Sequence, residues 1–368
     1  MAASGAGQVY LVDSAAQLWA LDVSDSARPA PLSHTRLDDP GYDASGLASP
    51  VLFDPASQQV VTVAPGSRNF QVLDVGNPAQ PGIQGTYRLG HLGRDAAIQR
   101  RGAGTSEQTD LAFVATSSIG VTCLDYTNPQ NITRRSLQAT SGDANGVAVD
   151  GSLVYVAAGN GGLRIYDYAS PDSPVLRSTL NTGGSASRVC AGNGIAYVAD
   201  RNAGLVVVDA TEPAAPQTLG TYPQLAGKNV ARLELAGHFL YVAFNENGAG
   251  VLLLADPSSL RSVAFYLGHG TVSALAMASG FLYTGNLECG VSIVDPSLTP
   301  NGDINAAGRT TLVDLAILLN EIVGNLSPGV APCLFPEMSD LDGNGAVDAV
   351  DYLMLAAGIV ENRTLPFR

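Results

Sequence analysis

The residues that specify a chemistry most clearly lie between positions 338 and 353, where oxygen-bearing side chains recur at regular spacing. Calcium prefers six to eight oxygen ligands from carboxylates, amides and main-chain carbonyls, held by a loop that winds around the ion. Gly345 stands at the sixth position of such a loop, where the chain turns sharply and glycine does so at little cost. The sequence therefore predicts a calcium-binding loop. Its ligands would be the side chains of Asp340, Asp342, Asn344, Asp348 and Asp351 and the main-chain carbonyl of Ala346.

A second, imperfect copy of this loop lies upstream. Ala307 occupies its fifth position and has no side-chain oxygen, so we expect the upstream site to bind calcium more weakly. An ordinary surface turn rich in Asp and Gly is the alternative interpretation, but it does not explain why the pattern occurs twice. The predicted ligands of the upstream loop are the side chains of Asp303, Asn305, Thr311 and Asp314 and the carbonyl of Arg309.

Apolar residues follow each loop at the spacing of one helical face, whereas Pro332 and Pro336 argue against a helix before the second loop. Two loop–helix units of this kind resemble a dockerin type I domain over about residues 301–360. The resemblance implies a small α-helical domain over residues 299–368, Ca2+ as cofactor, and a cohesin-like protein or cell-surface scaffold as partner. The two loop positions that the family uses for cohesin recognition, often Ser-Thr, are Leu312-Val313 and Ala349-Val350 here. A cohesin partner is therefore implied by the resemblance alone.

A second pattern, a hydrophobic strand that ends in Asp and is followed by Pro, recurs along the first 298 residues. The best copies contain four short strands in about 42 residues, the size of one propeller blade, which must stack on neighbours to bury its two faces. These repeats resemble the LVIVD-repeat β-propellers over about residues 8–298. We therefore predict a mainly β fold, with a seven-bladed propeller of four-stranded blades over residues 1–298. The repeated residues are Asp22, Asp74, Asp125, Asp167, Asp209 and Asp295, and the sixth copy has Ala255 instead.

The first and last copies of the repeat are incomplete in the sequence. Residues 1–8 are short and rich in glycine, and Pro296 follows directly after the third strand of the seventh copy. We therefore expect blade one to lack its first strand and blade seven its fourth. Because propellers often close through an N-terminal strand that completes the last blade, we hypothesise that the chain is truncated at its N-terminus and lost a secretion signal there.

The polar residues of the repeats have both structural and functional interpretations. We expect each repeated Asp to accept hydrogen bonds from the backbone of its own turn. Loops on one face of a propeller usually carry its function, so polar residues between second and third strands are candidates for binding a polysaccharide or peptide, with solvated turns as the alternative. A further polar cluster, His91, Arg94 and Asp95, is explained by a surface loop. The loop candidates are Arg68, Asn69, Asn160, Arg201, Asn202, Asn245, Glu246, Asn247, Asn286 and Glu288.

No catalytic motif is recognisable, and we predict no catalytic or organic-cofactor-binding residue. The four histidines lack metal-ligand spacing, although two carboxylates from different blades could still meet in space as a glycosidase pair. Cys123 and Cys190 are expected to be buried free thiols. A disulfide between Cys289 and Cys333 is disfavoured by the distance from Cys289 to the end of the propeller.

The chain has a net charge of −14 and a single lysine, Lys228, and no apolar run long enough to span a membrane. The absence of a basic patch argues against nucleic acid or anionic membrane partners. We therefore predict a secreted or cell-surface protein in which a non-catalytic propeller recognition module is attached through a calcium-dependent dockerin-like domain. The alternatives are a carbohydrate-active hydrolase or lyase carried by a dockerin, and a propeller that serves only as a spacer.

Overall fold

The computed structural model describes residues 1–4, 7–13, 16–24, 30–37, 50–63, 68–237, 239–244, 248–254, 261–266, 272–278, 281–286 and 290–294. Both predicted calcium loops, the predicted helices after them and the expected domain boundary at residue 298 lie outside these ranges and remain predictions. The chain divides into two compact units, Met1–Leu233 and Glu234–Arg368.

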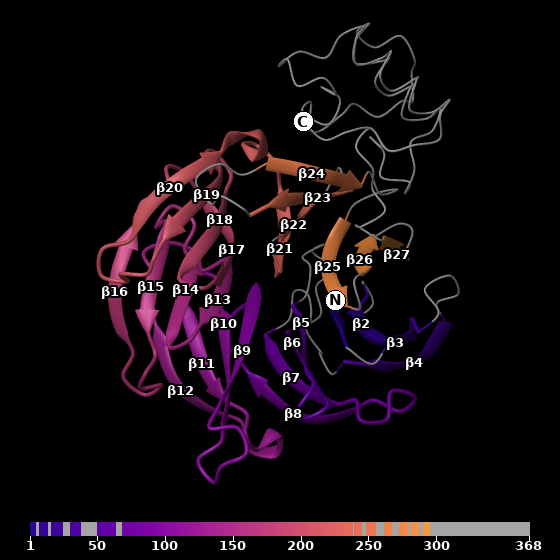
Figure 1. Ribbon diagram of the computed structural model, residues 1–368. Helices are drawn as coiled ribbons and strands as arrows, with labels where there is room; N and C mark the ends of the chain where they lie inside the picture. Colours follow the sequence, from indigo (N-terminus) through magenta and orange to yellow (C-terminus); the bar gives the residue numbers. More distant parts are fainter. Residues whose placement is uncertain are drawn as a thin grey trace, which may run out of the picture. The chain divides into compact units, whose positions relative to one another are not determined.

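The described residues form a β-propeller whose sheets are built from strands that follow one another in the chain (Figure 1). The first two sheets are β1 (Ala2–Ala3), β2 (Gln8–Val12), β3 (Gln17–Asp22) and β4 (Ala30–Arg36), then β5 (Val51–Asp54), β6 (Gln59–Val63), β7 (Asn69–Asp74) and β8 (Gly82–Arg88). The next two are β9 (Asp95–Arg101), β10 (Thr109–Ala115), β11 (Val121–Asp125) and β12 (Thr133–Gln138), then β13 (Gly146–Asp150), β14 (Leu153–Ala157), β15 (Leu163–Asp167) and β16 (Val175–Leu180).

The remaining sheets follow the same order. The fifth is β17 (Ala186–Gly192), β18 (Ile195–Asp200), β19 (Gly204–Asp209) and β20 (Gln217–Tyr222), and the sixth is β21 (Val230–Ala236), β22 (Phe239–Phe244), β23 (Gly248–Leu253) and β24 (Arg261–Tyr266). The last sheet has three strands, β25 (Val272–Ala278), β26 (Phe281–Asn286) and β27 (Gly290–Val294). The helices of the described residues are two short 3-10 turns, η1 (Pro129–Asn131) and η2 (Pro223–Leu225).

The mainly β propeller fold is thus confirmed, but the predicted seven four-stranded blades are corrected to six, with a sheet of three strands after them. The expectation that blade one lacks its first strand is also wrong. Ala2 and Ala3 form β1 by pairing with Tyr10 and Val9. The turn needs few residues because Gly7 adopts a φ of +80° and the N–H of Ser4 donates to the carbonyl of Gln8 at 2.8 Å.

Strand β14 explains why the repeats must stack. Successive side chains of a strand point to opposite faces of its sheet. Val154 and Val156 accordingly pack in a cluster with the preceding sheet, whereas Tyr155 and Ala157 pack in a cluster with the following sheet. All four side chains are buried, and burial of a large apolar side chain stabilises the fold by about 1.5–3 kcal/mol. A single blade would leave one of these two faces in water.

The repeated aspartates act in the turns as predicted. Each of the five described ones ends the third strand of its sheet and accepts a hydrogen bond from the main-chain N–H two residues later, at 2.8–3.1 Å. Their structural role is therefore confirmed, while Asp295 and Ala255 lie outside the described residues. The five are Asp22, Asp74, Asp125, Asp167 and Asp209.

Within the Met1–Leu233 unit, the first strands β9, β13 and β17 lie side by side, and the fourth strands β8, β12, β16 and β20 lie on the outside with many exposed residues (Figure 1). The start of each first strand pairs with the end of the second strand, as Asp95 does with Ala115 and Ala186 with Asp200. The loops between second and third strands therefore turn where the first strands begin. We call this end of the sheets the proximal end.

Candidate functional site

The predicted ligands of both calcium loops, Asp303 to Asp351, lie outside the described residues. Among the loop candidates at the proximal end, Arg68, Asn160, Arg201 and Asn202 are exposed, and Asn69 is partly buried as the first residue of β7. Asn286 is the last residue of β26. The other four candidates, Asn245, Glu246, Asn247 and Glu288, are outside the described ranges.

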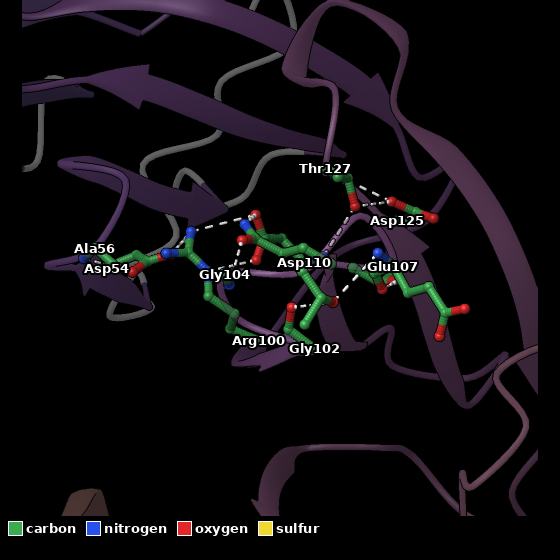
Figure 2. A network of polar contacts seen from close by, with 12 residues as sticks. Asp54, Ala56, Arg100, Gly102, Gly104, Glu107, Asp110, Asp125 and Thr127 are labelled. Atoms are coloured by element: carbon green, nitrogen blue, oxygen red, sulfur yellow. Dashed lines mark hydrogen bonds and ion pairs between the residues drawn. The ribbon is translucent and has the colours of Figure 1, made fainter.

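Two arginine clusters organise the polar interior of the Met1–Leu233 unit, and the first is centred on Arg100 (Figure 2). The guanidinium of Arg100 lies between two carboxylates from different sheets. Its Nε donates to Oδ1 of Asp110 at 2.6 Å, and its Nη2 donates to Oδ2 of Asp54 at 2.7 Å. The hydrogen bond with Asp110 is the largest cause of the raised pKa of Arg100. This cluster cross-links the second and third sheets.

Every carboxylate oxygen of the Arg100 cluster already accepts a hydrogen bond. Oδ1 of Asp54 binds the N–H of Ala56 at 3.0 Å, and Oδ2 of Asp110 binds the side chains of Gln108 and Arg100 at 3.3 and 3.2 Å. The Asp54–Asp110 pair therefore differs from a glycosidase pair, in which one carboxyl group must be free to donate a proton to the substrate. Its chemistry is that of a structural ion-pair network.

The second cluster lies at the proximal end, where residues of four sheets meet. Asp95, the first residue of β9, is buried. Its Oδ1 accepts from Nη1 of Arg232 on β21 at 3.1 Å, and its Oδ2 accepts from the N–H of Val147 on β13 at 3.1 Å. Asp95 and Arg232 belong to sheets three apart, so side chains of the first strands converge on one region.

Arg188 on β17 fills the space between these strands without a carboxylate partner in the described residues. Its Nε donates to the carbonyl of Ala231 at 2.7 Å, and its Nη1 donates to the carbonyls of Asn145 and Ser187 at 3.1 and 2.8 Å. Burial lowers the pKa of Arg188. The charge of Asp95 raises this pKa, and the charges of Arg232, Arg94 and Arg201 lower it further.

Arg94 completes this group from the position before β9. Its Nε is buried and has no hydrogen-bond partner among the described residues. We call Arg94, Asp95, Arg188, Arg201 and Arg232 the proximal cluster; its four arginines and one aspartate give a net charge of +3 in a chain whose net charge is −14. A buried donor without an acceptor costs about 1–3 kcal/mol, which an incoming acceptor would recover.

The interpretation of His91, Arg94 and Asp95 as a surface loop was wrong for Asp95, whereas Arg94 lies in the loop before β9 and is partly exposed. His91 is exposed, but Asp95 is buried at the start of a central strand. One sequence signal could have revealed the cluster: Arg188 and Arg232 occupy the third position of β17 and β21, the same place in successive repeats.

The two described cysteines match their predicted state. Cys123 and Cys190 are buried thiols that are not joined in a disulfide. Burial raises the pKa of the Cys123 thiol to about 12, so it stays protonated and unreactive at neutral pH. Across the described ranges, no group of three or more His, Cys, Asp or Glu side chains is placed to hold a metal ion. None of the helices described here is long and apolar enough to cross a membrane.

Comparison with known families identifies both parts of the chain. LVIVD repeats match residues 141–182, 183–223 and 227–267, so each match coincides with one of the sheets β13–β16, β17–β20 and β21–β24. A dockerin type I domain matches residues 301–359. The comparison with curated proteins found no match.

Solved structures support the fold of the chain. The computationally designed Ika8 protein is 11% identical with a TM-score of 0.55, over 79% of this chain and 94% of that one. A chain of the mitotic checkpoint complex is 14% identical with a TM-score of 0.58, over 79% of this chain and 90% of that one. At such low identity, the likeness extends to the fold alone.

Proposed function

We propose that the chain is an extracellular, non-catalytic binding protein whose propeller is a recognition module and whose C-terminal domain attaches it to a cohesin-like scaffold. The occurrence of LVIVD repeats and a dockerin type I domain in one chain carries this proposal. Dockerins attach their partner module to a scaffold, so the propeller is the part left to meet a ligand. The network around Arg100 adds support, because its two carboxylates are committed to structural bonds.

Calcium would control the attachment. The loop from Asp340 to Asp351 supplies four carboxylates and one amide, enough negative charge and oxygen to hold one ion, with the upstream loop as a weaker site. Because the ligands come together only when the loop folds, calcium binding and folding of this domain are coupled.

The test is a calcium titration of the chelator-treated full chain by calorimetry and far-ultraviolet circular dichroism. The described residues contain strands and two 3-10 turns, so a calcium-dependent gain of helical signal would report on residues 301–359. We expect saturable binding and a helical gain, both strongly reduced in the D340A/D342A variant. The matched control is D143N, which changes an exposed propeller aspartate and should behave like the unmodified chain.

Attachment is then measured separately. We expect an immobilised type I cohesin to retain the chain in calcium and to release it in chelator. Absence of saturable calcium binding would refute the calcium-dependent attachment. Calcium binding without retention by any cohesin offered would leave the metal site in place and refute the cohesin partner.

A further inference from the structure

We propose that the proximal cluster binds one compact oxyanion, a carboxylate or sulfate group carried by the ligand of the propeller. The inference deepens the proposed recognition function and rests on it, since it names the chemistry that the module would recognise. It is carried by the contact of Arg232 with the buried carboxylate of Asp95, by the hydrogen bonds that hold Arg188 beside Ala231, next to Arg232 in the chain, and by the buried Nε of Arg94, which has no acceptor among the described residues.

Hydrogen bonds at the proximal end fix the guanidinium groups of Arg188 and Arg232. Arg188 touches the main chain on either side of its own strand, at Asn145 before β13 and at Ala231 on β21. Arg232 reaches across to Asp95 on β9. Because four first strands contribute to these contacts, the cluster lies where those strands converge rather than on the outer surface. A ligand that approaches the proximal end would meet several guanidinium groups together.

Charge at the cluster is not balanced by the carboxylates around it. Both oxygens of Asp95 are used, one by Arg232 and the N–H of Ala96 and the other by the N–H of Val147. Asp200, at the end of β18, is held by the Thr182 hydroxyl at 2.6 Å and by the main chain of its own turn. Hydrogen bonding leaves the charges of Asp95 and Asp200 in place, but four arginines against these two carboxylates still leave a positive surplus that a ligand can meet.

The donors that remain suit an oxyanion. Arginine presents its N–H groups in a planar fork that matches the spacing of carboxylate, sulfate or phosphate oxygens. The buried Nε of Arg94 lacks an acceptor, and the side chain of Arg201 is exposed with no recorded hydrogen bond among the described residues. The overall charge of −14 would repel a long polyanion, which favours a single charged group over nucleic acid.

The experiment uses the full chain in calcium-free buffer at constant low ionic strength, with sulfate, glucuronate and uncharged glucose as probes. Binding is measured by calorimetry and by the shift of the unfolding temperature. We expect saturable binding of the anions and none of glucose, with affinity falling as salt is added. Binding of glucuronate alone would identify a carboxylate on a sugar, and equal binding of sulfate would identify a site for the anionic group itself.

Two variants make the result decisive. R94Q/R201Q removes two guanidinium groups that have no hydrogen-bond partner recorded in the described part of the chain, so its fold should survive, and we expect the anion affinity to fall at least about tenfold. The control R177Q removes an exposed arginine on the outer strand β16 and should bind like the unmodified chain. The proposal is overturned if no anion binds saturably, or if R94Q/R201Q binds as well as R177Q. Calcium and cohesin binding would be unaffected by either failure.

Discussion

The two arginine clusters of the Met1–Leu233 unit differ in the partners that surround their guanidinium groups. Arg100 lies between two carboxylates and completes a closed network, whereas Arg188 contacts carbonyls and lies among other arginines. In the first cluster positive and negative charge are matched within the fold. In the second cluster the charges are not matched, and the excess positive charge lies where four first strands converge. The role of a buried arginine in this propeller is therefore better inferred from the groups that surround its guanidinium than from its position in the sheet.

Of the substitutions that test this contrast, R100M is expected to lower the stability of the fold most. The substitution leaves the carboxylates of Asp54 and Asp110, whose side chains are 9% and 7% exposed, without their counter-charge. Breaking one side of a buried ion pair costs about 3–5 kcal/mol, and we expect about 3 kcal/mol here because Arg100 keeps some contact with water. Chemical denaturation with urea measures the loss of unfolding free energy.

The matched control for R100M is R177Q, which breaks an ion pair with Asp167 in which the arginine side chain is 45% exposed. Surface pairs of this kind contribute about 0–1 kcal/mol. A loss in R100M no greater than that in R177Q would show that the Arg100 network is not a structural cross-link, and would return Asp54 and Asp110 to the candidates for chemistry.

R188M is expected to have a smaller effect on stability than R100M. It leaves the carbonyls of Ala231, Asn145 and Ser187 without a donor, which costs about 1–3 kcal/mol, but it also removes a charge that repels its neighbours. We expect a net loss of about 1 kcal/mol. Added salt should raise the stability of the unmodified chain more than that of R188M, because it screens repulsion among the arginines. An equal response to salt would argue against unbalanced charge in the proximal cluster.

Local pattern was enough to predict much of the propeller. Alternating apolar residues define strands such as β14, and the aspartate that ends β15 accepts its hydrogen bond in the turn that follows. Strand β1 was missed because a pairing of two alanines leaves no hydrophobic pattern. Asp95 was misplaced for a different reason: its burial depends on Arg232, 137 positions away, and no short segment of sequence contains that information.

R94Q tests whether Arg94 contributes to anion binding without contributing to the stability of the fold. Because the buried Nε of Arg94 has no acceptor among the described residues, its removal should not lower the unfolding free energy. The same substitution should weaken anion binding, so affinity and stability would respond independently. A destabilisation as large as that of R188M would mean that Arg94 serves the fold, and the proximal cluster would then resemble the Arg100 network.

The smallest effect concerns pH and a cluster at the protein surface. The hydrogen bond from Arg177 and that from the N–H of Ala169 hold the pKa of Asp167 below its ordinary value. A carboxyl group whose pKa is lowered by folding stabilises the protein above its unfolded pKa, near 3.9, and that contribution disappears as the pH falls through the folded pKa.

We therefore expect D167N to lose slightly less stability than the unmodified chain between neutral pH and about pH 3. The difference should be a few tenths of a kcal/mol, because the pair is exposed. Urea midpoints at the two pH values measure the difference. An acid response of D167N identical to that of the unmodified chain would contradict a stabilising role for this surface pair.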